Sequence, residues 1–307
     1  MHCGLRGLDP DTLYKTYLPG IAATLDLKRA KCAVEFRKAM ACKEVKMVLE
    51  GFRKRHEKQS PKAERIKMPY GLDLALRSRK VMYRMKKFEG NDKEILMKRI
   101  FVCQVVGITF LLRRSEHIVK RKQKDAPLLR RHLTFFDRSN KPIKYEDIGK
   151  QAHKASSVTL NVIFSKTDQS GYGRRTSHMS QPQDPETCTV SILENWISET
   201  RDKYSCKEED GLYFLPGYGR LGTKKLHEVM QLTVEDCGLK KLKKPVTSHS
   251  LRYGGATMLA AAGLPHYIIA IYGGWTQESK SLRIYTKPSD EMTRKVSRYM
   301  ARMARED

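Results

Sequence analysis

The chain has 307 residues, of which 40% are hydrophobic, and this composition excludes a disordered polymer and allows one large domain or two smaller ones. Sixty Lys and Arg side chains face 34 Asp and Glu, so the net charge of +26 favours an acidic partner, with nucleic acid first among the choices. The longest apolar run, residues 100–112, is too short to span a bilayer, and we expect no membrane partner.

Cysteine usage and the N-terminus both predict an intracellular protein. The seven cysteines are odd in number and scattered, and no CxxC pair occurs among them. This pattern disfavours a disulfide framework and a structural zinc site. The first residues, MHCGLRGLDPDTL, lack the apolar segment of a secretory signal.

The N-terminal part reads as a small helical domain. Apolar residues recur at intervals of three and four over residues 1–58, which are also rich in lysine and arginine. The stretch 53–69 is polar and charged and holds two prolines, and we expect a linker over residues 59–68. The larger second domain then occupies residues 69–307.

The second domain reads as mostly helical with one small sheet. Helices are expected over 70–88 and 91–112, the second as a buried core helix. Strand-forming residues lie on both sides of a turn within 128–148, and again over 158–166, followed by a glycine-containing turn at 167–175. Further helices are expected from Pro185 to the C-terminus, the last over roughly 288–304 as a core helix or as one that docks on a neighbouring protomer. The predicted fold class is mainly α with a small antiparallel β-sheet.

The sequence lacks the common motifs of nucleotide and metal chemistry. It contains no G-x-x-x-x-G-K-[ST], no G-x-G-x-x-G after a strand and no H-E-x-x-H. It also lacks a convincing carboxylate cluster for two metal ions. We therefore expect no cofactor and no metal, and any phosphate chemistry must use basic side chains and a protein nucleophile.

The first half of the second domain contains two groups of basic residues that could contact phosphate. Arg113 and Arg114 emerge where the apolar helix ends, with Glu116 close behind. Such a run is a solvated helix cap, or one arginine grips two phosphate oxygens while Glu116 steadies it. Lys166 ends the strand VIFSK, either as a solvated hairpin residue or as an ammonium group presented to a DNA groove.

The stretch HSLRYGGATM places His249 and Arg252 three residues apart, on one face of a helix. Thr247 or Ser248 is suited to cap that helix, whose first turn favours an anion. Taken by itself, a His-x-x-basic pair arises by chance in a chain this basic. Small residues, Gly254 and Gly255 among them, let another part of the molecule come close.

Two aromatic residues complete the set of candidates. YGGWTQESKSLRIYTK places two glycines before Trp275 and puts Tyr285 on a short amphipathic segment after it. Core packing is the ordinary role of a single Trp or Tyr.

Together, Arg-x-x-Glu, the hairpin Lys, His-x-x-Arg, Gly-Trp and Tyr resemble the tyrosine recombinase, or phage-integrase-like, family in their order. Residues 166–169 and the run HSLRYGGATMLAAAG are also similar to recombinases of eukaryotic mobile elements such as Cryptons and DIRS-like elements. The resemblance covers residues 70–303 as a catalytic domain, and residues 8–58 resemble the family's core-binding domain.

The resemblance implies a DNA strand-breaking and rejoining enzyme with Tyr285 as its nucleophile. Arg113 and Arg252 would hold the phosphate, Glu116 would support them, and Trp275 stands where the family has His or Trp. His249 would act as a base or a phosphate donor, and Lys166 would protonate the leaving oxygen. The spacing from Trp275 to Tyr285 is about one residue longer than usual, and Tyr272 and Tyr299 are the alternative nucleophiles.

The family also implies double-stranded DNA as partner, clamped between two domains, and a tetramer in the synaptic complex. The compartment would be the nucleus in a eukaryote and the cytoplasm in a prokaryote or virus. Three alternatives stay open: a catalytically inactive, domesticated DNA-binding protein of the same fold, a type IB topoisomerase-like enzyme, and an unrelated RNA- or chromatin-binding protein. The DNA target sequence and the biological outcome of recombination do not follow from the sequence.

Overall fold

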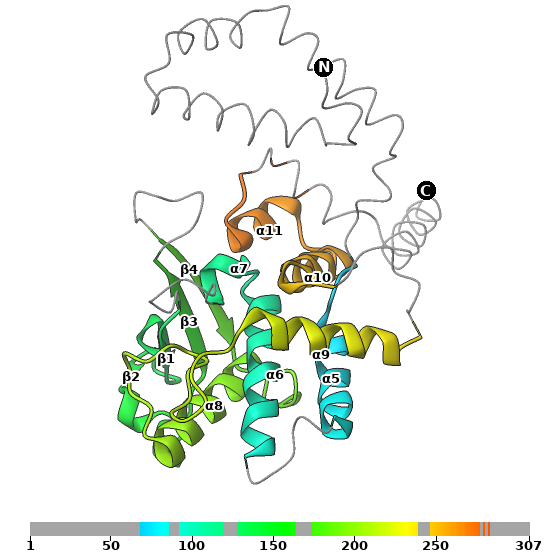
Figure 1. Ribbon diagram of the computed structural model, residues 1–307. Helices are drawn as coiled ribbons and strands as arrows, with labels where there is room; N and C mark the ends of the chain where they lie inside the picture. The colour runs from blue at the N-terminus through cyan, green and yellow to red at the C-terminus, as the bar shows by residue number, and fades with distance from the viewer. Residues whose placement is uncertain are drawn as a thin grey trace, which may run out of the picture. The chain divides into compact units, whose positions relative to one another are not determined.

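In the computed structural model the chain divides into two compact units, Met1–Ile66 and Lys67–Asp307. The structure describes residues 68–85, 92–118, 128–163, 173–238, 246–276, 279 and 282, all in the second unit (Figure 1). The expected N-terminal helical domain and its linker up to residue 67, the end of the hairpin around Lys166 and the final helix lie outside the described residues.

The second unit is an α+β structure, which confirms the predicted fold class. Among its described residues, the helices of more than one turn are α5 (Leu72–Arg84), α6 (Lys93–Thr109), α8 (Thr189–Tyr204), α9 (Thr223–Asp236), α10 (Ser248–Ala261) and α11 (His266–Gly273). A single turn, α7 (Arg114–His117), follows α6, and the short 3-10 segments η4 (Arg130–His132), η5 (Tyr145–Asp147) and η6 (Gln151–His153) flank the first strands. None of the described helices is long and apolar enough to cross a membrane.

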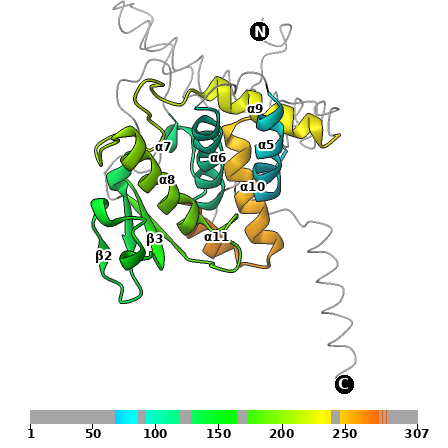
Figure 2. The same ribbon diagram turned by 90° about the horizontal axis from the view of Figure 1, so that it is seen from below.

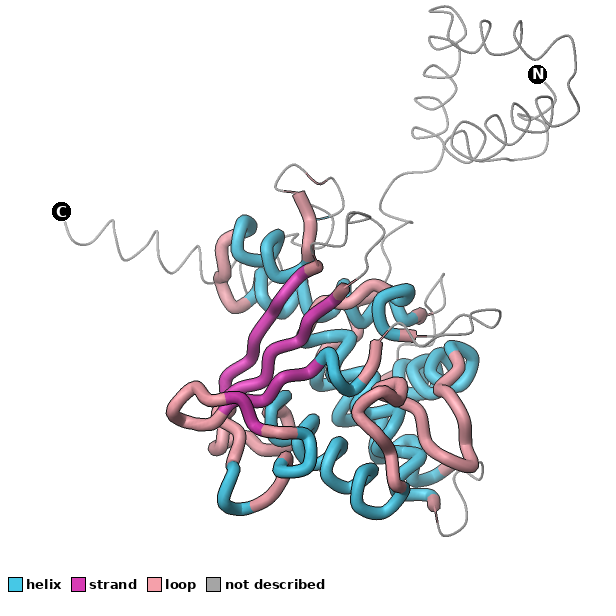
Figure 3. Tube along the Cα trace, turned by 90° about the vertical axis from the view of Figure 1, so that its left-hand side faces the viewer, coloured by secondary structure: helices cyan, strands magenta, loops and turns pink. Residues whose placement is uncertain are grey.

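The sheet has four antiparallel strands in the order β2-β1-β3-β4. They are β1 (Leu133–Phe136), β2 (Pro142–Ile143), β3 (Ser157–Val162) and β4 (Arg174–Met179). The strand expected over 158–166 corresponds to β3, which ends at Val162. The turn expected over 167–175 reaches two residues too far along the chain at its end, because Arg174 and Arg175 already pair with β3. Figure 3 shows the sheet on one side of the helices.

Helix α6 is the centre of the core, as its apolar run predicts. Every residue from Arg99 to Ile108 is buried, so the helix is enclosed on all sides. It contacts α5 and α10 on one side and α8 on the other, and α8 in turn contacts β3 and β4 (Figure 2). These contacts fix the position of the C-terminal end of α6, and thereby the position of α7, which follows it.

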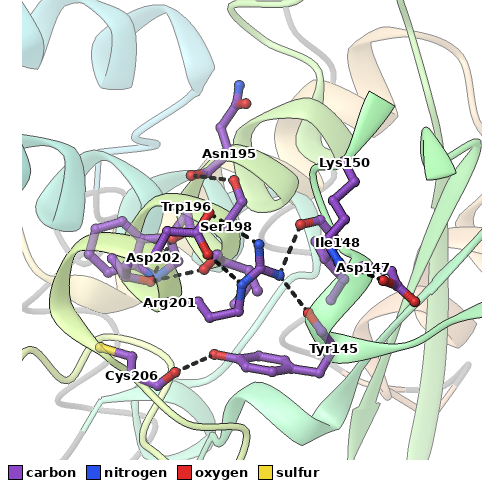
Figure 4. Close-up of polar contacts among 12 residues, drawn as sticks. Tyr145, Asp147, Ile148, Lys150, Asn195, Trp196, Ser198, Arg201, Asp202 and Cys206 are labelled. Atoms are coloured by element: carbon purple, nitrogen blue, oxygen red, sulfur yellow. Dashed lines mark hydrogen bonds and ion pairs between the residues drawn. The ribbon is translucent and has the colours of Figure 1, made fainter. Parts of the chain in front are cut away.

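An arginine on α8 holds the loops at the edge of the sheet. Nη1 of Arg201 donates hydrogen bonds to the backbone oxygens of Tyr145, at 2.6 Å, and Ile148, at 3.0 Å (Figure 4). The hydroxyl of Tyr145 donates to the backbone oxygen of Cys206 at 2.9 Å. These carbonyls lie outside the strands of the sheet, so side-chain donors satisfy backbone groups that the sheet does not pair.

Candidate functional site

A buried carboxylate, that of Glu116, is the centre of the candidate site. Helix α6 ends at Thr109, the chain turns through Leu111 with a positive φ of 50°, and Arg113 becomes the N-cap of α7. The backbone N–H of Arg113 donates to Oε2 of Glu116 at 2.7 Å, and its Nη1 donates to Oε1 at 2.8 Å. The Glu116 side chain is 1% exposed. Arg-x-x-Glu is therefore a buried capping arrangement, and not a solvated one.

Three guanidinium groups surround this carboxylate, and we call Glu116 with Arg113, Arg174 and Arg252 the arginine cluster. Nη2 of Arg174 lies 3.8 Å from Oε2 of Glu116, and Nη1 of Arg252 lies 3.9 Å from the same atom. The three arginines come from the N-cap of α7, from β4 and from α10. Only the tertiary fold brings these distant segments to one carboxylate.

Two of the arginines also bind the C-terminal end of α11. Nη2 of Arg252 donates to the backbone oxygen of Gly273 at 2.6 Å, and Nη2 of Arg113 donates to that of Gly274 at 3.2 Å. Nη1 of Arg252 donates to the backbone oxygen of Leu111. A helix C-terminus carries partial negative charge and unpaired carbonyls, so guanidinium groups suit it.

Trp275 covers the most deeply buried of these arginines. The Cζ atom of Arg252 lies 3.8 Å from the centre of the Trp275 ring, and the Arg252 side chain is 1% exposed. This is a cation–π contact between two residues of separate predicted motifs. The indole ring therefore contacts the cluster directly, which ordinary core packing of a lone tryptophan does not require.

The two glycines before Trp275 are needed for this contact. A Cβ atom on Gly273 would overlap the Trp275 ring. Gly274 is the C-cap of α11 with a positive φ of 62°, a left-handed conformation that glycine adopts without strain. The sequence Gly-Gly-Trp thus ends the helix and lets the indole ring fold back over it.

The glycines of α10 serve helix packing behind the cluster, as expected from the run of small residues. A Cβ atom on Gly254 would overlap the backbone of Tyr70, and one on Gly255 would overlap the backbone oxygen of Ile108 at the end of α6. The close approach of α10 to α6 sets the distance between Arg252 and Glu116.

The start of α10 is held by a histidine that the sequence did not single out. Thr247 is the N-cap, although its hydroxyl makes no capping hydrogen bond, and its backbone N–H donates to the hydroxyl of Ser250 at 3.3 Å. The backbone N–H of Ser248 donates to Nε2 of His227 at 2.8 Å. Half-buried His249 follows in the first turn, three residues before Arg252. The predicted His-x-x-Arg pair therefore does lie at a helix N-terminus.

The structure brings four predicted site residues into one contact network: Arg113, Glu116, Arg252 and Trp275. His249 lies on the same helix as Arg252, and Lys166 and Tyr285 lie outside the described residues. Of the alternative nucleophiles, Tyr272 donates its hydroxyl to the backbone oxygen of Ser177, and burial raises its pKa, which disfavours the nucleophilic phenolate. Tyr299 is also outside the described residues.

Arg174 is the member that sequence reasoning missed. It belongs to the polar strand RRTSHM, in which no apolar alternation distinguishes the core face from the solvent face. Burial lowers its pKa and the charge of Glu116 opposes that shift, but an arginine keeps its proton at neutral pH. The cluster is thus a fixed positive site, and the described residues hold no group of three or more His, Cys, Asp or Glu that could bind a metal ion.

The chain is similar to known proteins at the level of structure only. No protein-family model and no curated protein matches the chain. Among solved structures it is similar to the XerH site-specific recombinase bound to difH substrate, with a TM-score of 0.44, 15% identity and 76% of this chain covered. It is also similar to the XerA recombinase, with a TM-score of 0.43 and 17% identity, and to the Tn1549 transposon integrase in complex with transposon right end DNA, with a TM-score of 0.38 and 12% identity. The matches cover 54%, 64% and 66% of those three chains, so this chain spans little more than half of XerH.

Proposed function

We propose that this protein is a site-specific DNA recombinase or integrase, which cuts and rejoins DNA through a covalent 3′-phosphotyrosyl intermediate. The observation that carries the proposal is the arginine cluster, in which residues of separate motifs share one buried carboxylate. The partial exposure of Arg113 also supports the proposal. Its side chain is 20% exposed, so the arginine cluster can be reached from solvent at this residue. The finer placement in the Crypton or DIRS branch rests on the sequence resemblance.

The reaction proceeds by transesterification at phosphorus. The Oη atom of Tyr285 forms a bond to phosphorus while the bond to the 5′ oxygen breaks, so a 5′-hydroxyl leaves and the strand stays joined to the protein through its 3′ phosphate. His249 accepts the tyrosine proton, and Lys166 donates a proton to the leaving oxygen. Attack by the 5′-hydroxyl reverses each step without any external energy source.

The arginines supply the electrostatic part of the mechanism. Negative charge grows on the two non-bridging phosphate oxygens as phosphorus becomes five-coordinate. Preorganised guanidinium groups stabilise that charge in a site from which water is largely excluded. Glu116 and the carbonyls at the end of α11 fix the orientation of Arg113 and Arg252 before DNA binds.

Trp275 has two roles in this proposal. Its ring covers Arg252 and keeps water from one side of the guanidinium group. Its indole N–H is a donor that cannot titrate, and it is suited to a non-bridging phosphate oxygen. The ring follows directly after the turn whose carbonyls accept hydrogen bonds from Arg113 and Arg252, so these contacts fix the position of the ring.

The partner is double-stranded DNA, in keeping with the net charge of +26. We further propose that residues 1–58 form a DNA-binding domain that clamps the duplex together with residues 69–307, and that four protomers assemble in the synaptic complex. Light scattering of the protein with and without its DNA site measures this assembly. A complex that stays at one protomer per duplex at saturating protein contradicts it.

The test of the activity is a covalent-trapping assay. A nicked suicide DNA substrate that carries the target site is incubated with the full chain, and the protein–DNA adduct is separated on a denaturing gel. We expect an adduct with the native protein and none with Tyr285→Phe. Tyr267→Phe is the matched control, because this tyrosine lies on α11 and is 52% exposed.

The outcomes separate the readings of the site. An adduct that survives Tyr285→Phe overturns the assignment of the nucleophile, and Tyr272→Phe and Tyr299→Phe then identify the true one. Specific DNA binding without any adduct overturns the enzymatic proposal and favours a DNA-binding protein of the same fold. Relaxation of supercoiled DNA without strand exchange indicates a topoisomerase.

A further inference from the structure

Arg174 is built into the arginine cluster although no predicted motif includes it. It is the first residue of β4 and pairs with Val162 of β3. Along the strand, Arg174, Thr176 and His178 are at least partly buried, whereas Arg175, Ser177 and Met179 are exposed. The alternation of the strand therefore turns Arg174 toward the helices and Arg175 toward solvent.

Among the described residues, only part of the Arg174 guanidinium group has a partner. Nη2 donates to the backbone oxygen of Phe110 at 3.2 Å and lies 3.8 Å from Oε2 of Glu116. Nε and Nη1 are buried and make no hydrogen bond within the part of the chain that the structure describes. Nη1 packs against Gly274, where a Cβ atom would come within 3.0 Å of it. Buried donors without acceptors destabilise a fold.

The charge of the cluster is also unbalanced. Among the described residues, three guanidinium groups face the single carboxylate of Glu116, which gives a net charge of +2. Without Arg174, the remaining three residues, Arg113, Arg252 and Glu116, would have a net charge of +1. Buried charge that is not neutralised is unfavourable, and stability by itself would be better served by an apolar side chain at position 174. A residue kept against stability is a candidate for function.

The excess charge matches the chemistry of the proposed reaction. A phosphodiester in its ground state carries one negative charge on its non-bridging oxygens. The five-coordinate transition state, in which a tyrosine oxygen that has given up its proton is bonding to phosphorus, carries two. A cluster of net charge +2 therefore complements the transition state better than the bound substrate, which is the condition for accelerating a reaction.

We propose that Arg174 is a positioning residue of the cleavage site, which sets the charge of the arginine cluster to that of the transition state. It acts through Glu116, whose carboxylate it shares with Arg113 and Arg252, so that these two guanidinium groups are only partly neutralised. This inference rests on the proposed function, because it concerns the transition state of that reaction.

Two substitutions separate the charge of Arg174 from its hydrogen bond. Arg174→Lys keeps the charge, and Arg174→Gln removes it but keeps an N–H donor for the backbone oxygen of Phe110. Arg175→Gln is the matched control, since it removes one positive charge from the neighbouring, exposed position of the same strand. Single-turnover cleavage of the suicide substrate and DNA affinity are measured for each variant at equal ionic strength.

We expect Arg174→Gln to cleave roughly 100-fold more slowly while its DNA affinity changes by less than about threefold, because the lost interaction belongs to the transition state. Arg174→Lys should recover a large part of the rate, and Arg175→Gln should cleave at the native rate on saturating DNA. The melting temperature of Arg174→Gln should equal or exceed that of the native protein. A native cleavage rate in Arg174→Gln overturns the inference. A cleavage rate that is higher in Arg174→Gln than in Arg174→Lys also overturns it. The same holds if the cleavage rate of the variants falls only in proportion to their loss of thermal stability.

A second measurement does not depend on cleavage. Inorganic phosphate should raise the melting temperature of the native protein more than chloride at the same ionic strength, because an anion offsets the charge of the cluster. Arg174→Gln should lose most of this difference, and Arg175→Gln should keep it. An equal response in all three proteins overturns the inference. A native protein that forms no adduct overturns the proposed function instead, and this outcome is separate from the phosphate response.

Discussion

The ring of Trp275 lies over the guanidinium group of Arg252, with 3.8 Å between the Arg252 Cζ atom and the ring centre. The two residues are far apart in the sequence, so the fold brings them into contact. The turn at Gly273 and Gly274 returns the chain to α10, and the carbonyl of Gly273 accepts a hydrogen bond from the same arginine. The aromatic residue and the arginine therefore depend on each other for their positions.

Trp275→Ala should lower both stability and cleavage. Loss of the cation–π contact removes about 1–2 kcal/mol at a desolvated site, and the Arg252 guanidinium becomes open to water. Trp275→Phe keeps the stacked ring and should unfold near the native temperature, yet cleave roughly tenfold more slowly if the indole N–H binds phosphate. Thermal unfolding and the suicide-substrate assay measure the two effects. Tyr267→Ala, at an exposed position of α11, is the control, and an unchanged Trp275→Ala protein contradicts the role of the ring.

Glu116→Gln should be strongly destabilising. The amide has the shape of the carboxylate but removes the negative charge that three guanidinium groups share, and breaking a buried ion pair in this way costs about 3–5 kcal/mol. Chemical denaturation measures the free energy of unfolding. Glu199→Gln removes a carboxylate that is 26% exposed and pairs with Lys98 and Lys203, so its cost should stay below about 1 kcal/mol. Equal costs for the two variants would show that the cluster does not depend on Glu116.

Gly254→Ala should destabilise the protein although alanine is the better helix former. In an open helix position this change stabilises by up to about 1 kcal/mol. Here the added methyl group meets the backbone of Tyr70, whose N–H donates to the backbone oxygen of Ser250 at 3.0 Å, so α10 must move and the cost should be about 1–3 kcal/mol. Gly222→Ala is the control, because a Cβ atom there meets nothing within 4 Å. A gain in melting temperature for Gly254→Ala would contradict the close packing.

The buried imidazole of His117 should make stability depend on pH. Burial lowers its pKa from 6.5 to about 3, and its Nε2 atom has no hydrogen-bond partner among the described residues. The unfolded chain therefore binds one more proton than the native protein between these two pH values. The contribution of His117 is complete above pH 6.5 and is lost as the pH falls toward 3, by about 1.4 kcal/mol per pH unit.

Denaturation at pH 7.5 and pH 5.0 tests this sign. The native protein should lose more stability over that interval than His117→Gln, which has no group to protonate at this position. His178, whose pKa burial also lowers, stays in both proteins and cancels in the comparison. Identical pH dependence in the two proteins would contradict the prediction, because it would mean that His117 binds a proton as readily in the native protein as in the unfolded chain.

Much of the fold follows from local patterns. The apolar run at 100–112 predicts a helix buried on all sides, because no polar face remains to meet water, and α6 is such a helix. The glycines of α10 predict a close neighbour, and Tyr70 and Ile108 are found there. Strand boundaries follow less directly from sequence, since the end of a strand depends on its pairing partner, and β4 begins within the residues expected to form a turn.

The sequence by itself determined the chemical inventory of this protein: a large positive charge, the order of Arg113, Glu116, His249, Arg252 and Trp275, and the glycines that allow close packing. Only the tertiary structure decided that Glu116 is buried beneath three arginines and that Arg174 is one of them. Periodicity reports which residues share a face of one element. It holds no information on which elements meet, and Arg174 reaches Glu116 only because the sheet places β4 against the end of α6, where its side chain donates to the backbone oxygen of Phe110.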